Sequence, residues 1–237
     1  MPNYEIVTMK NKVTVKCANQ KMEQDLVITY KDALSSENAL KKLLDLTKTA
    51  EKLFYGVKGI TNLNDYIEYN DTENVTNMVY MFGYCSELEI HPTINTINAE
   101  NINYMFTQCT KLKTAILDTT NVIKMESCFS NCQLLEKVDL TSLDKITSTS
   151  NIGNAFTWCY SLKKLIIRTM NTIPALSTST FSRCYHLLGT VNSTYNPNGD
   201  KDGYIYVPDN MVNSLKSATN WSTYATQIKP LSELVED

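Results

Sequence analysis

The residues of this 237-residue chain that could do chemistry are seven cysteines, two histidines and one short string of acidic and amide side chains. Thiolates act as nucleophiles and zinc ligands. Imidazoles serve in acid–base catalysis, and alternating oxygen ligands are typical of calcium loops. Each role needs its own spacing, so the positions of these residues decide which roles are open.

Five of the cysteines recur at one offset from a phenylalanine, once in each of five similar segments. A zinc site gathers its ligands locally, whereas one cysteine per segment would form a row inside a repeated fold. A small side chain that buries well suits such a row. Cys128 occupies the place that Met81 and Met105 fill in other segments. We interpret all six as core residues: Cys85, Cys109, Cys128, Cys132, Cys159 and Cys184.

The acidic string at 198–209 partly matches an EF-hand calcium loop, which needs oxygen ligands at alternating positions, a glycine at the sixth and a carboxylate at the twelfth. Here the first ligand is an amide, the twelfth is an aspartate after a proline, and the flanks do not resemble two helices. A polar turn before a strand is the competing interpretation, and we predict no cofactor. The weak calcium candidates are Asn198, Asp200, Asp202 and Asp209.

The remaining signals for catalysis are weak. His91 and His186 have no nucleophile beside them in a recognised arrangement. With seven glycines in all, the chain has little material for a phosphate-binding loop. Repeat proteins rarely build a catalytic pocket alone, so we expect a protein that is not an enzyme.

The elements that would position these residues follow from an internal repeat. The motif Phe-x-x-Cys-x-x-Leu occurs five times, and its phenylalanines are 24, 23, 27 and 25 residues apart. This period lies within the roughly 20–29 residues of leucine-rich repeats. The five motifs begin at Phe82, Phe106, Phe129, Phe156 and Phe181.

Local patterns predict the structure of each repeat. After the leucine, apolar residues alternate with a period of two, as in Ala115 and Leu117, which predicts a strand with one buried face. Before and at the phenylalanine, Met78, Met81 and Phe82 have the i, i+3, i+4 spacing of a short helix. The predicted fold class is therefore an α/β leucine-rich-repeat solenoid of about five to six coils.

The ends of a solenoid need caps. We divide the chain into a small β appendage at 1–32, a capping helix with a degenerate first coil at 33–63, repeats at 64–200 and a C-terminal cap at 201–237. In the appendage we expect strands at 4–8, 13–17 and 26–30. We expect a helix at 35–55, a last strand at 204–207 and a helix from Pro208 to about Ala218.

Composition excludes several partners. A net charge of −3 with 20% charged residues gives no electrostatic reason to expect nucleic acid or an anionic membrane. The N-terminus lacks the basic and apolar regions of a signal peptide, and no apolar run is long enough to span a membrane. We therefore expect reduced thiols in a cytosol-like compartment.

Equal offsets line up along a solenoid, which predicts two outward surfaces. The first is an edge with residue types enriched in interface hot spots. Its members are Tyr84, Trp158, Tyr160, Arg183 and Tyr185. The alternative is that some rings pack against neighbouring coils. The second surface is the strand face, two and four residues after each leucine, with Lys137, Lys164 and Ile166, and with Ile116 also expected to be exposed.

The repeats resemble the bacterial BspA-type leucine-rich repeats over about residues 72–192. The family's Asn-Val-x-x-Met motif is matched at 74–78 and 121–125. Its Met-Phe-x-x-Cys-x-x-Leu motif is matched at 81–88, with a related stretch at 128–132. Residues 206–224 are similar to a C-terminal cap found on such repeats in low-GC Gram-positive bacteria and their phages.

The resemblance implies a recognition surface, because family members are typically surface proteins that adhere to host proteins or other cells. This chain departs from them in lacking a signal peptide, a lipobox and a wall-sorting motif, which favours a phage origin. We expect a phage-encoded inhibitor that binds and blocks a bacterial host protein, such as a defence enzyme, in the host cytoplasm. The alternative is a virion or cell-surface attachment protein. The oligomeric state is left open.

Overall fold

The computed structural model describes residues 6–9, 12–15, 44–45, 47–59, 61–64 and 66–236. Near the N-terminus, strand β1 (Ile6–Met9) pairs antiparallel with β2 (Lys12–Val15). They correspond to the first two strands predicted from the sequence. The third predicted strand, at 26–30, and residues 35–43 of the predicted helix lie outside the described residues.

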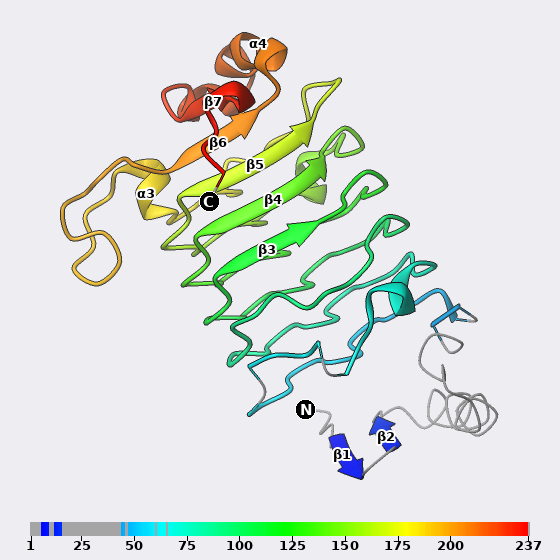
Figure 1. The fold of residues 1–237 in the computed structure, drawn as a ribbon. Coiled ribbons are helices and arrows are strands. Elements are labelled where there is room, and N and C mark those ends of the chain that lie inside the picture. The colour runs from blue at the N-terminus through cyan, green and yellow to red at the C-terminus, as the bar shows by residue number, and fades with distance from the viewer. Residues whose placement is uncertain are drawn as a thin grey trace.

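A five-stranded parallel sheet forms the C-terminal half of the molecule, and its strand order follows the chain order (Figure 1). The register places equivalent repeat positions side by side, such as Lys137 beside Lys164. This arrangement confirms an α/β fold with a parallel strand in successive repeats. The strands are β3 (Thr114–Leu117), β4 (Lys137–Ser142), β5 (Lys164–Thr169), β6 (Tyr204–Val207) and β7 (Ile228–Pro230).

The earlier repeats continue the same stack through isolated parallel bridges: Thr49 with Asn77, Asn77 with Asn101, and Asn101 with Lys124. Helices are short in the described part of the chain. They are α3 (Tyr185–Leu188) and α4 (Val212–Ser217), with 3-10 helices η1 (Tyr69–Thr72), η2 (Thr149–Asn151), η3 (Asp209–Met211), η4 (Trp221–Tyr224) and η5 (Leu231–Glu233).

A ladder of phenylalanine rings runs through the core. Neighbouring rings are stacked with centroids 5.1–5.5 Å apart, and all of them are buried. Each repeat supplies one ring, so stacking of repeats makes a continuous core that a single repeat could not form. The ladder consists of Phe54, Phe82, Phe106, Phe129, Phe156 and Phe181.

The short helix predicted around each phenylalanine is wrong. The chain there forms consecutive turns in which left-handed residues alternate along the path, as at Ser127 (φ 52°) and Asn131 (φ 62°). Such residues interrupt a right-handed helix. Their backbone N–H groups bond the next repeat instead: Ser127 N–H donates to Gly153 O at 2.9 Å, and Asn131 N–H to Thr157 O at 2.8 Å.

The left-handed positions give a direct stability prediction. Asn154 has a φ of 56° and is exposed. Asn154→Gly should leave the free energy of unfolding nearly unchanged, whereas Asn154→Val should lower it by about 1–2 kcal/mol, because a β-carbon with two branches crowds this conformation. Urea unfolding of the two variants checks this. Equal stability of both would show that the backbone at this position is right-handed.

The helix predicted at 35–55 also ends too late. Leu44, Asp45 and Thr47 are helical, but from Thr49 the chain follows the path of a repeat. Phe54 N–H donates to Met81 O at 2.8 Å, so backbone groups needed for a helix bond the next repeat instead. Residues 49–56 therefore follow the path of a repeat instead of a helix.

The fifth repeat does not continue directly into a strand after Leu187. Helix α3 ends at Gly189, whose φ of 66° turns the chain away. The residues from 190 to 203 then form a loop, and β6 takes the place beside β5. The strand predicted at 204–207 is confirmed, and η3 with α4 matches the predicted helix after Pro208.

Candidate functional site

The cysteine row lies inside the core. Each repeated cysteine donates its thiol hydrogen to the carbonyl of the phenylalanine in the preceding repeat, with Sγ–O distances of 3.0–3.1 Å. The position therefore selects a small buried side chain that is also a weak donor. Burial raises the pKa of Cys85 to about 12 and raises the pKa values of the other described thiols.

These thiols should be unreactive until the protein unfolds, because only the thiolate is nucleophilic. At about pH 8, we expect iodoacetamide to leave the six described cysteines unmodified in the native protein and to alkylate them in denaturant; peptide mass spectrometry reads both states. Since their folded pKa values are raised, the unfolded chain loses thiol protons first as pH rises above about 9. Stability is therefore full below this pH and falls above it. Rapid alkylation of native Cys132 would contradict the buried position.

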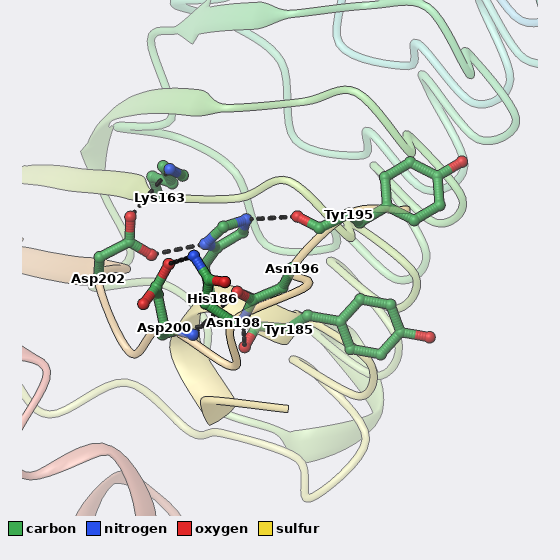
Figure 2. Close-up of polar contacts among 8 residues, drawn as sticks. All are labelled: Lys163, Tyr185, His186, Tyr195, Asn196, Asn198, Asp200 and Asp202. Atoms are coloured by element: carbon green, nitrogen blue, oxygen red, sulfur yellow. Dashed lines mark hydrogen bonds and ion pairs between the residues drawn. The ribbon is translucent and has the colours of Figure 1, made fainter. Parts of the chain in front are cut away.

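Three of the calcium candidates, Asn198, Asp200 and Asp202, lie near His186 (Figure 2). Asp202 is bound by Lys163 Nζ at 2.8 Å and by His186 Nδ1 at 2.5 Å. Burial raises the pKa of Asp202, but these hydrogen bonds outweigh burial and hold it below its usual value. Asp209 lies elsewhere and accepts the Ser232 N–H at 3.1 Å. In the described part of the chain, no group of three or more His, Cys, Asp and Glu could hold a metal ion.

The loop between α3 and β6 instead has its own internal order. Asn198 Nδ2 donates to Asp200 Oδ2 at 3.4 Å, and Asn196 bonds both the backbone N–H and the backbone carbonyl of Asp200 at 2.9 Å. His186 Nε2 lies 3.0 Å from the carbonyl of Tyr195. These bonds indicate a polar turn before the final strands, which is the competing interpretation of the acidic string.

Both histidines make contacts within the protein. The two ring nitrogens of His186 bond Asp202 and the Tyr195 backbone, so neither is directed at a hydroxyl or a thiol. His91 packs with its ring 5.5 Å from Phe106, and burial lowers its pKa to about 4. Neither arrangement is that of a catalytic base beside a nucleophile.

The structure brings the predicted edge residues together in two pairs. The Arg183 guanidinium lies 5.9 Å from the Trp158 ring centroid, within the range of a cation–π contact. Tyr160 and Tyr185 are stacked with centroids 5.0 Å apart. Trp158 keeps 39% of its surface exposed, so this pair is accessible to a partner.

The loop residue Tyr195 partly covers the second pair. Its ring lies 4.6 Å from Tyr160, and its hydroxyl donates to Gln133 Oε1 at 2.7 Å. Gln133 in turn donates to Asn131 Oδ1 at 3.0 Å, and Asn131 donates to Gln108. A chain of amide hydrogen bonds therefore extends from the C-terminal aromatic pairs toward the earlier repeats.

Four tyrosines of the N-terminal repeats, Tyr55, Tyr80, Tyr84 and Tyr104, lie close together. Tyr80 stacks on Tyr104 with centroids 4.6 Å apart, and Tyr55 lies 5.7 Å from Tyr80 and 5.2 Å from Tyr84. Burial, followed by neighbouring tyrosines, raises the pKa values of Tyr55 and Tyr80. Only Tyr84 was predicted. The equal offset of Tyr80 and Tyr104, two residues before the phenylalanine, is the missed signal, because this stretch was assigned to a helix.

These side chains form one surface, which we call the aromatic edge. It comprises Tyr55, Tyr80, Tyr84, Tyr104, Gln108, Asn131, Gln133, Trp158, Tyr160, Arg183, Tyr185 and Tyr195. Tyr84, Trp158 and Arg183 have left-handed backbone, with φ of 62–65°. Backbone hydrogen bonds from Tyr84 N–H to Thr107 O and from Trp158 N–H to Ser182 O hold two of these positions before any partner arrives.

The second predicted surface, the strand face, is partly covered. Ile116 on β3 is 64% exposed, but Ile166 on β5 is fully buried, so its predicted exposure is wrong. The C-terminal residues lie across this part of the sheet (Figure 1). Lys164 on one side of Ile166 donates to Val235 O at 3.3 Å, and Arg168 on the other side bonds Glu236 at 2.6 Å.

These features define the class of protein: a parallel-sheet repeat protein with an ordered aromatic edge. Within it, the chain belongs to the family described as Mycoplasma protein of unknown function, DUF285, whose model matches residues 44–143 and 91–182. Neither the curated proteins nor the solved structures gave a match. In the described residues, no helix has the length and apolar character needed to cross a membrane.

Proposed function

We propose that the chain is a leucine-rich-repeat solenoid of the BspA type and that it acts as a non-catalytic protein-binding module. The phenylalanine ladder, the bridges between successive repeats and the parallel sheet support the solenoid. The Asn-Val-x-x-Met and Met-Phe-x-x-Cys-x-x-Leu motifs support the BspA relation, and they lie within the residues that the DUF285 model matches.

The aromatic edge is the observation that carries the binding function. Trp, Tyr and Arg are the residue types enriched in interface hot spots. Here Trp158, Arg183 and Tyr84 are exposed, and the backbone N–H groups of Trp158 and Tyr84 donate to adjacent repeats. A rigid surface loses little side-chain entropy on binding. The edge therefore suits a folded protein partner better than a small substrate, which needs a concave pocket.

The proposed biological setting rests on the resemblance to BspA-type repeats. We propose that the module is phage-encoded and blocks a bacterial host protein by occupying its surface, with a defence enzyme as one possible target. The alternative proposal is a virion or cell-surface attachment protein. The two differ in the partner: an inhibitor binds a cytosolic host protein as a soluble body, whereas an attachment protein binds capsid, tail or surface components.

Affinity capture from lysate of the bacterial host, with and without phage infection, tests this function. We expect one host protein to be retained by the wild type and lost by the variant Trp158→Ala with Tyr185→Ala. The matched control is Ile97→Ala, which removes an exposed apolar side chain outside both the edge and the strand face. Capture of the same protein by all three forms would overturn the role of the aromatic edge, and capture of tail or capsid proteins would support attachment.

A further inference from the structure

The strand face carries two rows of side chains in register. One row contains Lys137 beside Lys164, with Tyr204 on the next strand. The other contains Ile116, Asp139 and Ile166 on adjacent strands. Like charges opposite each other on neighbouring strands are destabilising unless an anion lies near them. Paired lysines beside aliphatic side chains therefore suit a ligand that is both acidic and apolar.

Arg168 extends the cationic part of this face. Its guanidinium bonds the Asp139 carboxylate through Nε at 2.9 Å and also through Nη2, while Nη1 is directed to a second carboxylate. Asp139 is 9% exposed and Arg168 neutralises it. Asp139 thus fixes the guanidinium in an orientation that can receive another carboxylate in planar geometry.

The C-terminal segment, residues 231–236, already binds there in this manner. Its carbonyl at Val235 accepts from Lys164, and its Glu236 carboxylate accepts from Arg168. A hydrogen bond from Arg168, with smaller effects of Lys137 and Lys164, lowers the pKa of Glu236. Among the described residues, these contacts include one backbone carbonyl and one carboxylate, which are general features of an acidic peptide.

The contacts of the last described residues with the sheet are largely exposed to solvent. Val235 is 74% exposed and the Glu236 side chain 57%. Ion pairs with this exposure contribute little to stability. The anchors nearer to β7, between Lys229 and Glu233 and between Ser232 and Asp209, do not involve β4 or β5. The last residues could therefore leave the sheet while 228–233 keep their places.

We propose that the strand face is a second binding surface, specific for an extended peptide of a partner protein that carries an aliphatic residue next to a carboxylate, and that the C-terminal segment masks it. The partner peptide replaces the segment, bonding Lys164 through a backbone carbonyl and Arg168 through its carboxylate. The exposed Ile116 gives it additional apolar surface on β3. This surface is separate from the aromatic edge, so it stands or fails independently of the function proposed above.

Fluorescence polarisation with a labelled peptide of residues 231–237 tests the proposal. The protein forms are the full chain, a chain ending at Glu233 and the full chain with Glu236→Lys, which keeps its length if the truncation fails to fold. We expect the two unmasked forms to bind the peptide at least about tenfold more tightly than the full chain. Circular dichroism confirms that each form is folded.

Two controls define specificity. The same peptide with Glu236→Gln should bind the unmasked chain about fivefold or more weakly, since a neutral amide loses the charge-assisted bond to Arg168. In the protein, Lys164→Ala should weaken binding, whereas Lys216→Ala on α4 should not. Equal affinity for masked and unmasked forms, or no binding by either folded unmasked form, would overturn the proposal. Loss of the host partner in the edge variants would leave it unaffected.

Discussion

Replacing Phe129 with alanine is expected to lower the free energy of unfolding by about 3–5 kcal/mol. The ring is fully buried and stacked between Phe106 and Phe156, with centroids 5.5 Å away on both sides. Its removal would leave a cavity between two repeats. The interior cannot collapse into it, because hydrogen bonds between the repeats fix their spacing.

Chemical denaturation with circular dichroism measures this change. Ile116→Ala is the matched control, since it removes an apolar side chain that is 64% exposed and should change stability by less than about 0.5 kcal/mol. A loss below about 1 kcal/mol in Phe129→Ala would contradict the continuous ladder, because a ring outside a packed core costs little to remove.

The variant Trp221→Ala is expected to be destabilised to a similar degree, by about 3–5 kcal/mol. Trp221 in η4 is 1% exposed, and its indole N–H donates to Pro174 O at 2.9 Å. The neighbouring Tyr224 lies edge-on to Phe181 at 5.0 Å and thus covers the end of the ladder. Loss of Trp221 removes the anchor of this cap and exposes the last repeats.

Trp221→Phe separates packing from hydrogen bonding. It keeps an aromatic ring in place, loses the bond to Pro174 and should cost clearly less than the alanine variant. Hydrogen exchange should show that Trp221→Ala increases exchange at β6 and β7 first, because stacked repeats make their contacts with neighbouring repeats. Uniform exchange along the whole chain at low denaturant would contradict a local capping role.

The core could be predicted from the sequence because its signal is periodic. Phe, Cys and Leu recur at fixed offsets, and a buried position is the same position in every repeat. The strands at 114–117, 137–142 and 164–169 followed from the alternation after each leucine. The clustering of Trp158 with Arg183 and of Tyr160 with Tyr185 followed from equal offsets in the same way.

The turns around each phenylalanine could not be distinguished from a helix by pattern alone. Consecutive tight turns and a helix both bring residues three and four apart onto one side, so Met78, Met81 and Phe82 satisfy either. The left-handed conformation of Tyr80 and Tyr84 is set by hydrogen bonds to the next repeat. Tyrosine has no strong preference for that conformation. The left-handed conformation therefore cannot be predicted from the residues around each tyrosine.

The covered strand face has no local signal either. Arg168 bonds Glu236, which is 68 residues away. Such a long-range contact produces no periodic pattern in the sequence. The residues around Ile166 therefore do not indicate whether the strand face is exposed or covered. The covering segment comes from the C-terminus.

Site-specific photo-crosslinking tests the central claim, that the aromatic edge is the surface that binds a protein partner. A photoreactive phenylalanine analogue would replace Tyr84 or Trp158 on the edge and Asn213 on α4 as an exposed control, in protein incubated with host lysate. We expect one and the same protein to be crosslinked from positions 84 and 158 and not from 213. Crosslinking of that protein from position 213 alone, or from none of the three while it is still captured, would contradict the role of the aromatic edge.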